Sequence, residues 1–242
     1  VKALFGQLYA DPGLSLFWHG LFMILTVAIV VAGVHRGVER WSRILMPMLF
    51  FMVLALVLRA AGSEGFARAL DFVFGAHSDK LTPAGVLEAV GHSSCTRSLG
   101  MGARLTSGGY MRSDEDVVSA SLAVGGLDTL ISLLACLMIF PIIFGAGLEP
   151  SAGPGLVFIS LPIAFGQLPG GALWALVFFV LLAVAALTSA ISLLEVAVSH
   201  TVDVHGWKRR RATLVIGAVI FLVGIPSALS GGTALFGGDF AA

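Results

Sequence analysis

Long apolar blocks separated by short polar stretches dominate the pattern of the chain. Five blocks are clear, at residues 14–34, 44–61, 117–147, 172–198 and 212–229. Because about 20 apolar residues match the hydrocarbon thickness of a bilayer, each block predicts a membrane-spanning helix. A sixth and weaker block, at residues 85–110, is interrupted by polar and glycine residues. Such backbone is tolerated at membrane depth where it packs in protein or lines a wet cavity, so this block predicts a broken span.

The composition agrees with a membrane protein. The chain has 242 residues, of which 57% are hydrophobic and 12% are charged, whereas soluble domains carry about 25% charged residues. The formal net charge is zero, so nothing suggests a nucleic-acid partner. Cys95 and Cys136 give neither a disulfide framework nor a metal-ligand spacing. We therefore predict an all-α membrane protein, a single membrane domain over residues 1–242 with about six transmembrane helices.

Basic residues concentrate in three stretches, at residues 35–43, 104–116 and 200–211. These stretches fall in alternate loops, so the positive-inside rule places all three in the cytoplasm and both ends of the chain outside. Six spans satisfy this alternation and five would break it, which supports counting residues 85–110 as a span. We predict a multi-pass protein of the cell (inner) membrane.

The connection at residues 150–171 carries no charged residue, and the alternation puts it outside. Its run LPIAF, at residues 161–165, indicates a short helix that dips towards the membrane. The alternative is a loop that is merely apolar.

Polar residues lie near the middle of three spans. They are Thr96 with Ser98, Asp128, and Thr188 with Ser189. A carboxylate at mid-depth costs about 2.5–3.5 kcal/mol on insertion scales, so it is tolerated when it faces a partner or an ion. Hard cations prefer oxygen ligands, and broken helices with freed carbonyls build sodium and substrate sites in transporters. The alternatives are structural: a carboxylate bonded to a neighbouring helix, and hydroxyls bonded to their own backbone.

Four groups of short motifs resemble, in the same order, those of the neurotransmitter:sodium symporter family, in particular bacterial sodium-dependent amino-acid transporters. They are GVER and ILMP at residues 37–40 and 44–47; SLGMGA at 98–103 with Tyr110 and DED at 114–116; GLEP and GPGL at 147–150 and 153–156; and AALTSAISLLE at 185–195. In the family they mark the start of the fifth helix, the broken sixth helix, the fourth outer loop and the eighth helix. The similarity is collinear from about residue 20 to residue 225.

The resemblance implies family helices four to nine of a LeuT-type inverted-repeat bundle. Residues 14–61 would end the first repeat, and residues 85–229 would form most of the second. The implied function is sodium-coupled symport of amino acids or related small amines by alternating access, with sodium ions co-transported. Chloride dependence stays open, because the carboxylate of Asp128 could replace a chloride whereas Ser132 is a residue type of chloride-dependent members. The bilayer and the missing transporter helices would be the other partners.

The resemblance also assigns the site residues, position by position. Sodium would be bound by Thr96, Asp128, Ala185, Thr188 and Ser189. The amino-acid substrate would lie against Cys95, Ser98, Met101 and Leu193. The cytoplasmic gate would use Tyr110 and Asp203.

The chain departs from the family pattern near the site. Cys95 stands where an aromatic lid is expected, and Arg97 and Arg104 replace apolar residues. The first and tenth family helices are absent from the sequence, so we expect a fragment that is inactive alone. The alternative is a truncated or degenerate non-transporting membrane protein that acts at most as an assembly partner. A third alternative is an intramembrane enzyme that uses His92, Ser94 and Cys95, but the sequence indicates no general-base geometry, so no enzyme activity is expected.

Cysteine labelling from one side of intact cells tests the predicted topology. Residues 35–43 and 200–211 are expected in the cytoplasm and residues 150–171 outside. A Ser42→Cys variant should therefore stay unlabelled when a membrane-impermeant thiol reagent is added to intact cells. Labelling of that cysteine from the outside would contradict the assignment.

Overall fold

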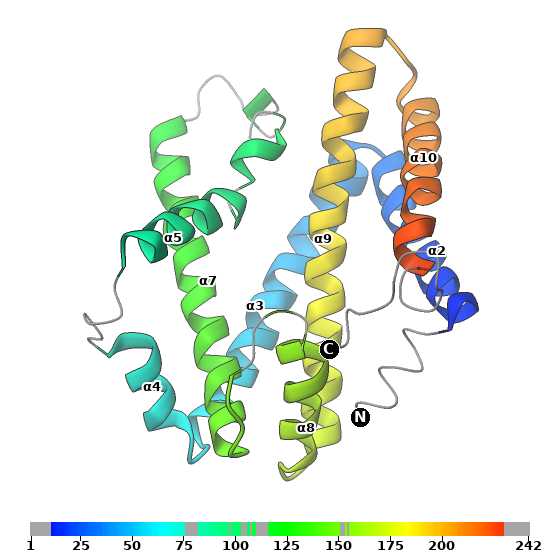
Figure 1. Ribbon diagram of the computed structural model, residues 1–242. Coiled ribbons are helices and arrows are strands. Elements are labelled where there is room, and N and C mark those ends of the chain that lie inside the picture. Colours follow the sequence, from blue (N-terminus) through cyan, green and yellow to red (C-terminus); the bar gives the residue numbers. More distant parts are fainter. Residues whose placement is uncertain are drawn as a thin grey trace.

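The computed structural model describes residues 11–75, 82–96, 98–102, 106, 108–109, 116–150, 153 and 155–229. Every regular element in these ranges is a helix, and the long helices form a bundle (Figure 1). The α9 helix (Gly171–His205) runs through the middle, where it contacts α2 (Pro12–Val31), α3 (Arg40–Ala61) and α10 (Arg209–Leu229). The α7 helix (Val117–Gly145) packs on α3.

These five helices are long and apolar enough to cross a membrane, by length and composition. Each corresponds to one of the five clear apolar blocks, which confirms the predicted all-α membrane class. Polar caps define where two of them begin. The Asp11 carboxylate accepts from the backbone N–H of Gly13 at 2.9 Å and of Leu14 at 3.1 Å, and the Asp116 carboxylate accepts from that of Val118 at 3.0 Å. These bonds satisfy N–H groups that have no partner inside the helix.

The sixth block differs from the other five. Its described residues form α5 (Pro83–Thr96) and the 3₁₀ turn η3 (Leu99–Met101), and neither is long enough to span a bilayer. The predicted interruption is thus present, whereas the count of six spans stays a prediction. The connection predicted at residues 200–211 is shorter than expected, because α9 continues to His205 and α10 begins at Arg209. A helix need not end where its apolar run ends.

Four further short elements lie between the spans in the described ranges. The π-helix η1 (Val34–Glu39) precedes α3, while η4 (Leu156–Ser160) leads into α8 (Leu161–Gly166), within the stretch where a short helix was expected. The α4 helix (Phe66–Phe74) was not expected from the sequence. It packs on α7, where Phe72 contacts the rings of Phe140 and Phe144, and Arg68 lies 4.7 Å from the Phe144 ring centroid.

Two apolar cores lie at different levels along α9. The first joins α3, α7, α8 and the early part of α9 through residues such as Leu56, Ile142, Phe165 and Phe178. The second joins α2, α10 and the later part of α9 through Val30, Leu194, Val198 and Ala212. Between Leu181 and Ile191, α9 has no buried residue, and only the partly buried Leu187 packs against the second core.

A buried ion pair ties α2, α9 and α10 together. Glu195 in α9 is only 5% exposed, and its carboxylate accepts both terminal nitrogens of the Arg209 guanidinium, one of them at 2.9 Å. Two nitrogens of Arg209 also donate to the backbone carbonyl of Val30, each at 3.2 Å. Val30 lies in the last turn of α2, whose end carries partial negative charge, so the cation also caps that helix.

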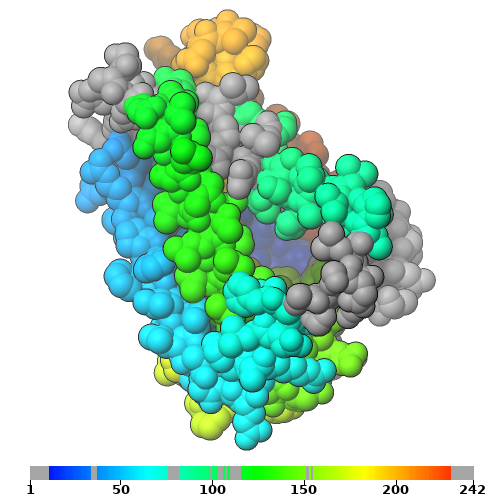
Figure 2. Space-filling model, turned by 90° about the vertical axis from the view of Figure 1, so that its left-hand side faces the viewer, coloured from blue at the N-terminus to red at the C-terminus, as the bar shows by residue number. Residues whose placement is uncertain are grey.

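The α5 helix, in contrast, buries none of its residues. Figure 2 shows a hollow between α5 and α7, with the more distant atoms of α2 visible through it. The facing half of α7 also exposes large apolar side chains, among them Val118, Leu122 and Leu127. The bundle is therefore well packed around α9 and open around α5.

Truncating the two arginines that form ion pairs tests how much the buried pair stabilises the fold. Arg209→Ala leaves Glu195 charged and buried, which should lower the free energy of unfolding by about 3–5 kcal/mol. Arg43→Ala is the matched control, because Arg43 is 78% exposed and pairs with Glu39 on the surface, where such pairs contribute about 0–1 kcal/mol. Thermal unfolding of the detergent-solubilised variants measures both effects. Equal losses for the two variants would contradict the central role of the buried pair.

Candidate functional site

The backbone changes direction between α5 and η3. Ser98 has φ 53° and ψ 33°, in the left-handed region, and Gly102 follows with φ 72°. The hydrogen bonds around Ser98 are short-range: its N–H donates to the Cys95 carbonyl at 2.9 Å, and its carbonyl accepts from Met101 at 3.2 Å. A left-handed angle costs a non-glycine residue about 1–2 kcal/mol and cannot continue a helix. Among the described residues, the chain departs from α-helix from Ser98 to Gly102, so the predicted interruption of this block is confirmed there.

A cavity of about 380 Å³, the break cavity, lies against this change of direction. Its lining comes from α3, from the end of α5 with η3, and from the middle of α9. The lining residues are Met46, Cys95, Thr96, Ser98, Met101, Thr188, Ser189, Ser192 and Leu193. All four residues assigned to the substrate by resemblance are among them, together with three of the five assigned to sodium. Residues 94 positions apart in the sequence thus meet at one cavity.

The α9 wall of this cavity presents oxygen atoms. The Thr188 hydroxyl donates to the carbonyl of Ala185 at 2.8 Å, and the Ser192 hydroxyl donates to that of Thr188 at 3.1 Å. A hydroxyl that donates its proton in this way keeps lone pairs for a cation. Ala185, Thr188 and Ser189 lie within about one helical turn, so they can face one ion. Serine and threonine hydroxyls with a purely structural role in a helix form the same bonds.

Of the first predicted sodium corner, the described residues place only Thr96 at the break cavity. Thr96 reaches the break cavity, and its hydroxyl donates to the Ser93 carbonyl at 3.1 Å. Asp128 lies in α7 and is not among the described residues that line the cavity. The hollow between α5 and α7 separates the two helices that carry Thr96 and Asp128 (Figure 2). The Ser132 hydroxyl donates to the backbone carbonyl of Asp128 at 2.8 Å.

Asp203, one of the two residues assigned to the cytoplasmic gate by resemblance, lines a second cavity. This cavity of about 470 Å³ is lined by Gly102 and Thr106 after the break, and by Ser199, His200 and Asp203 of α9, among others. The two cavities thus flank the break, one reaching Met101 and the other beginning at Gly102. Tyr110, the expected partner of Asp203, and Arg97 both lie outside the described residues.

A break in a helix beside a hydroxyl-lined wall agrees with the family that the sequence motifs resemble. A profile of the sodium:neurotransmitter symporter family matches residues 11–238, which is nearly the whole chain. The chain belongs to this family. The match confirms the resemblance that the motifs carried.

Individual relatives match nearly all of this chain, whereas the chain matches only about half of each relative. An uncharacterised sodium-dependent transporter of Bacillus subtilis is 37% identical over 98% of this chain and 54% of its own length. One of Haemophilus influenzae is 35% identical over 90% of this chain and 48% of its own length. The crystal structure of MhsT in complex with L-phenylalanine is 41% identical with a TM-score of 0.83, over 98% of this chain and 55% of that chain.

These likenesses confirm the predicted fold class, a part of a LeuT-type symporter bundle, and they fit the expectation that family helices are missing. The chain spans about half the length of the curated relatives it matches. Their names describe transporters. The Ser94 hydroxyl donates to the Val90 carbonyl at 2.9 Å rather than to His92.

Sequence reasoning missed two lining residues of the break cavity. Ser192 lies one turn after Thr188, so the spacing of hydroxyls along the eighth family helix could have identified it. Met46 is in α3, directly before Pro47, and nothing in its own type or spacing marks it as a cavity residue. Its position depends on how α3 crosses α9, which only the folded structure shows.

The two cysteines provide an internal test of water access to the break cavity. Cys95 is exposed and lines the cavity, whereas Cys136 is half-buried in α7. A charged, water-soluble methanethiosulfonate should therefore modify Cys95 faster than Cys136, because reaction needs access to the thiolate. Peptide mass spectrometry of the labelled protein measures both rates, and Cys95→Ser should remove the fast phase. Faster labelling of Cys136 would show that water does not reach the cavity.

Proposed function

We propose that this chain forms the part of a sodium-coupled symporter that carries half of the substrate and sodium sites, as family helices four to nine. The whole protein would move amino acids or related small amines by alternating access. The observation that carries the proposal is the break cavity, where seven residues assigned from sequence motifs line one space beside a broken helix. Residues 14–61 would end the first inverted repeat, and residues 85–229 would form most of the second.

The proposed substrate is an amino acid with an apolar side chain. Met46, Met101 and Leu193 give the cavity an apolar side. Ser98, at the break, offers a hydroxyl and a nearby irregular backbone to polar groups of the substrate. MhsT, which is 41% identical, has been solved with L-phenylalanine. Because Cys95 occupies the position of the usual aromatic lid, the site has room for a bulky side chain at that point.

The proposed sodium corner on α9 consists of the Ala185 carbonyl and the hydroxyls of Thr188 and Ser189. Three oxygens are too few to replace the hydration shell of a cation, since hard cations in proteins take about six oxygen ligands or more. The remaining ligands would come from the first family helix. A second sodium corner, with Thr96 and Asp128, would form only when the hollow between α5 and α7 closes. Chloride dependence remains open in this proposal.

A graft tests transport function directly. We would replace the matched part of MhsT with this chain and measure sodium-dependent binding of L-phenylalanine. Thr188→Val should raise the sodium concentration for half-maximal binding about tenfold or more, because a polar contact to a charge contributes about 1.5–3 kcal/mol. Thr201→Val is the matched control, since Thr201 is on the same helix and its hydroxyl also donates to a backbone carbonyl at 2.8 Å.

The outcomes separate the proposal from its alternative. The 242-residue chain alone should bind little sodium, because each corner lacks its ligands from the first helix. A graft that folds but binds no L-phenylalanine at any sodium concentration would favour a degenerate, non-transporting protein. Equal effects of Thr188→Val and Thr201→Val would remove Thr188 from the sodium site.

A further inference from the structure

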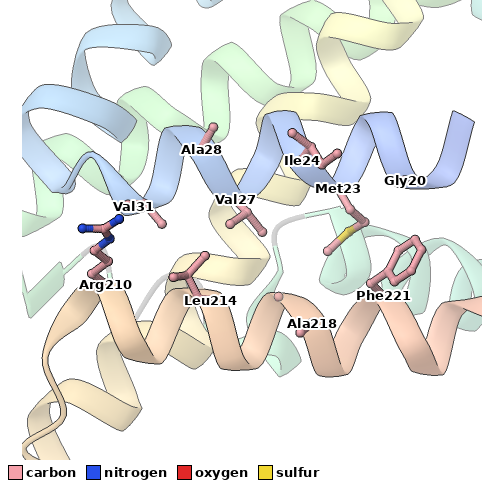
Figure 3. A pocket seen from close by; sticks show the side chains of 11 residues that line it. Gly20, Met23, Ile24, Val27, Ala28, Val31, Arg210, Leu214, Ala218 and Phe221 are labelled. Atoms are coloured by element: carbon pink, nitrogen blue, oxygen red, sulfur yellow. The ribbon is translucent and has the colours of Figure 1, made fainter. Parts of the chain in front are cut away.

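An apolar groove of about 520 Å³ runs between α2 and α10, on the side of α10 away from its bond to Glu195. Figure 3 shows Arg210 at one end of the groove and Phe221 towards the other, with Val27 and Leu214 facing each other between them. The two helices meet closely along this line: a Cβ on Gly217 would lie 2.5 Å from a methyl carbon of Val27. Small residues of this kind let helices approach in membranes, and here they leave a long furrow beside the contact.

The guanidinium of Arg210, at the mouth of the groove, forms no hydrogen bond or ion pair with the described part of the chain. Arg209, its neighbour, is bound to Glu195 and Val30, and Arg211 lies 5.0 Å from the ring centroid of Trp207. Arg210 is exposed, lines the groove, and has neither a hydrogen bond nor an ion pair there. The N-terminus of α10 adds partial positive charge at the same place. The mouth therefore suits an anion.

The length of the groove matches one leaflet. Phe221 lies eleven residues after Arg210 along α10, which corresponds to roughly 16 Å of helix. Half of a bilayer's hydrocarbon core is about 15 Å thick. A lipid acyl chain that starts at the level of Arg210 would thus reach the bilayer midplane within the groove. Arg210 belongs to the basic stretch expected in the cytoplasm, and anionic lipids are concentrated in the cytoplasmic leaflet.

We propose that the α2–α10 groove binds one anionic phospholipid of the cytoplasmic leaflet, with its phosphate at Arg210 and an acyl chain along Val27, Leu214 and Phe221. The apolar lining of the groove would accommodate the acyl chain, and the positive charge of Arg210 would favour a negatively charged headgroup. The site lies apart from the break cavity and shares no lining residue with it. It is independent of the proposed transport function, so either can fail alone.

Native mass spectrometry of the purified chain with added dioleoyl phosphatidylglycerol or dioleoyl phosphatidylcholine tests this proposal. We expect tighter binding of phosphatidylglycerol. Arg210→Gln should weaken it about fivefold more than Arg211→Gln does, since one arginine near a membrane surface contributes roughly 1 kcal/mol. Arg211→Gln removes the same charge one residue away, from a side chain that does not line the groove. Ala218→Phe, which fills the groove, should reduce binding of both lipids.

Three results would overturn the proposal. Equal losses for Arg210→Gln and Arg211→Gln would indicate diffuse attraction to the surface. Equal binding of the two lipids would leave an apolar furrow without headgroup recognition. Disappearance of the Arg210 effect in the MhsT graft would show that another part of a complete protein covers the groove. If Ala218→Phe fails to fold, the comparison of the two arginine variants still decides.

Discussion

The buried pair of Glu195 and Arg209 is the interaction on which the order of this bundle depends. Two charges inside an apolar bundle are tolerated only when they are paired and hydrogen-bonded, and here the guanidinium also satisfies a carbonyl at the end of α2. One side chain therefore joins three helices. Because apolar contacts between membrane helices are non-directional, this polar contact provides a defined rotation of α9 about its axis. That rotation decides which α9 residues face the break cavity.

The candidate site lies where the apolar packing of α9 is interrupted. One core holds α9 up to Leu181 and the other from Ile191 onwards, and Thr188 and Ser189 lie between them. Both residues line the break cavity, and the Thr188 hydroxyl donates to the Ala185 carbonyl of its own helix, so this partly buried donor is satisfied without a neighbouring helix. Across the cavity the wall is a broken helix. A rigid, firmly packed wall thus faces one whose backbone is irregular and whose helix α5 buries nothing.

Much of this arrangement follows from the sequence, and the exceptions have physical causes. Blocks of about 20 apolar residues predicted the five spans, and the polar run near Ser98 predicted the break, because both depend on local composition. The sequence pattern did not predict the α4 helix, because its nine amphipathic residues are too few to form a membrane span. The loop after α9 was overestimated because helices outlast their apolar runs. The motif resemblance identified most of the residues that line the break cavity. The position of Met46, and the distance between the helices that carry Thr96 and Asp128, depend on how helices cross, which no local sequence pattern encodes.

The open side of the bundle explains why the two sodium corners differ. The proposed α9 corner takes the three ligands that this chain supplies from one turn of a single helix, so the positions of those three oxygens relative to one another do not depend on the rest of the family fold. The other proposed corner needs Thr96 of α5 and Asp128 of α7 to lie close together, whereas α5 buries none of its residues and a hollow lies between the two helices. Under the proposed function, the family helices that fill this hollow would therefore both pack against α5 and supply ligands for the ion. On the proposed function, sodium binding at this corner and closure of the helices would be one event, which is the coupling that a symporter requires.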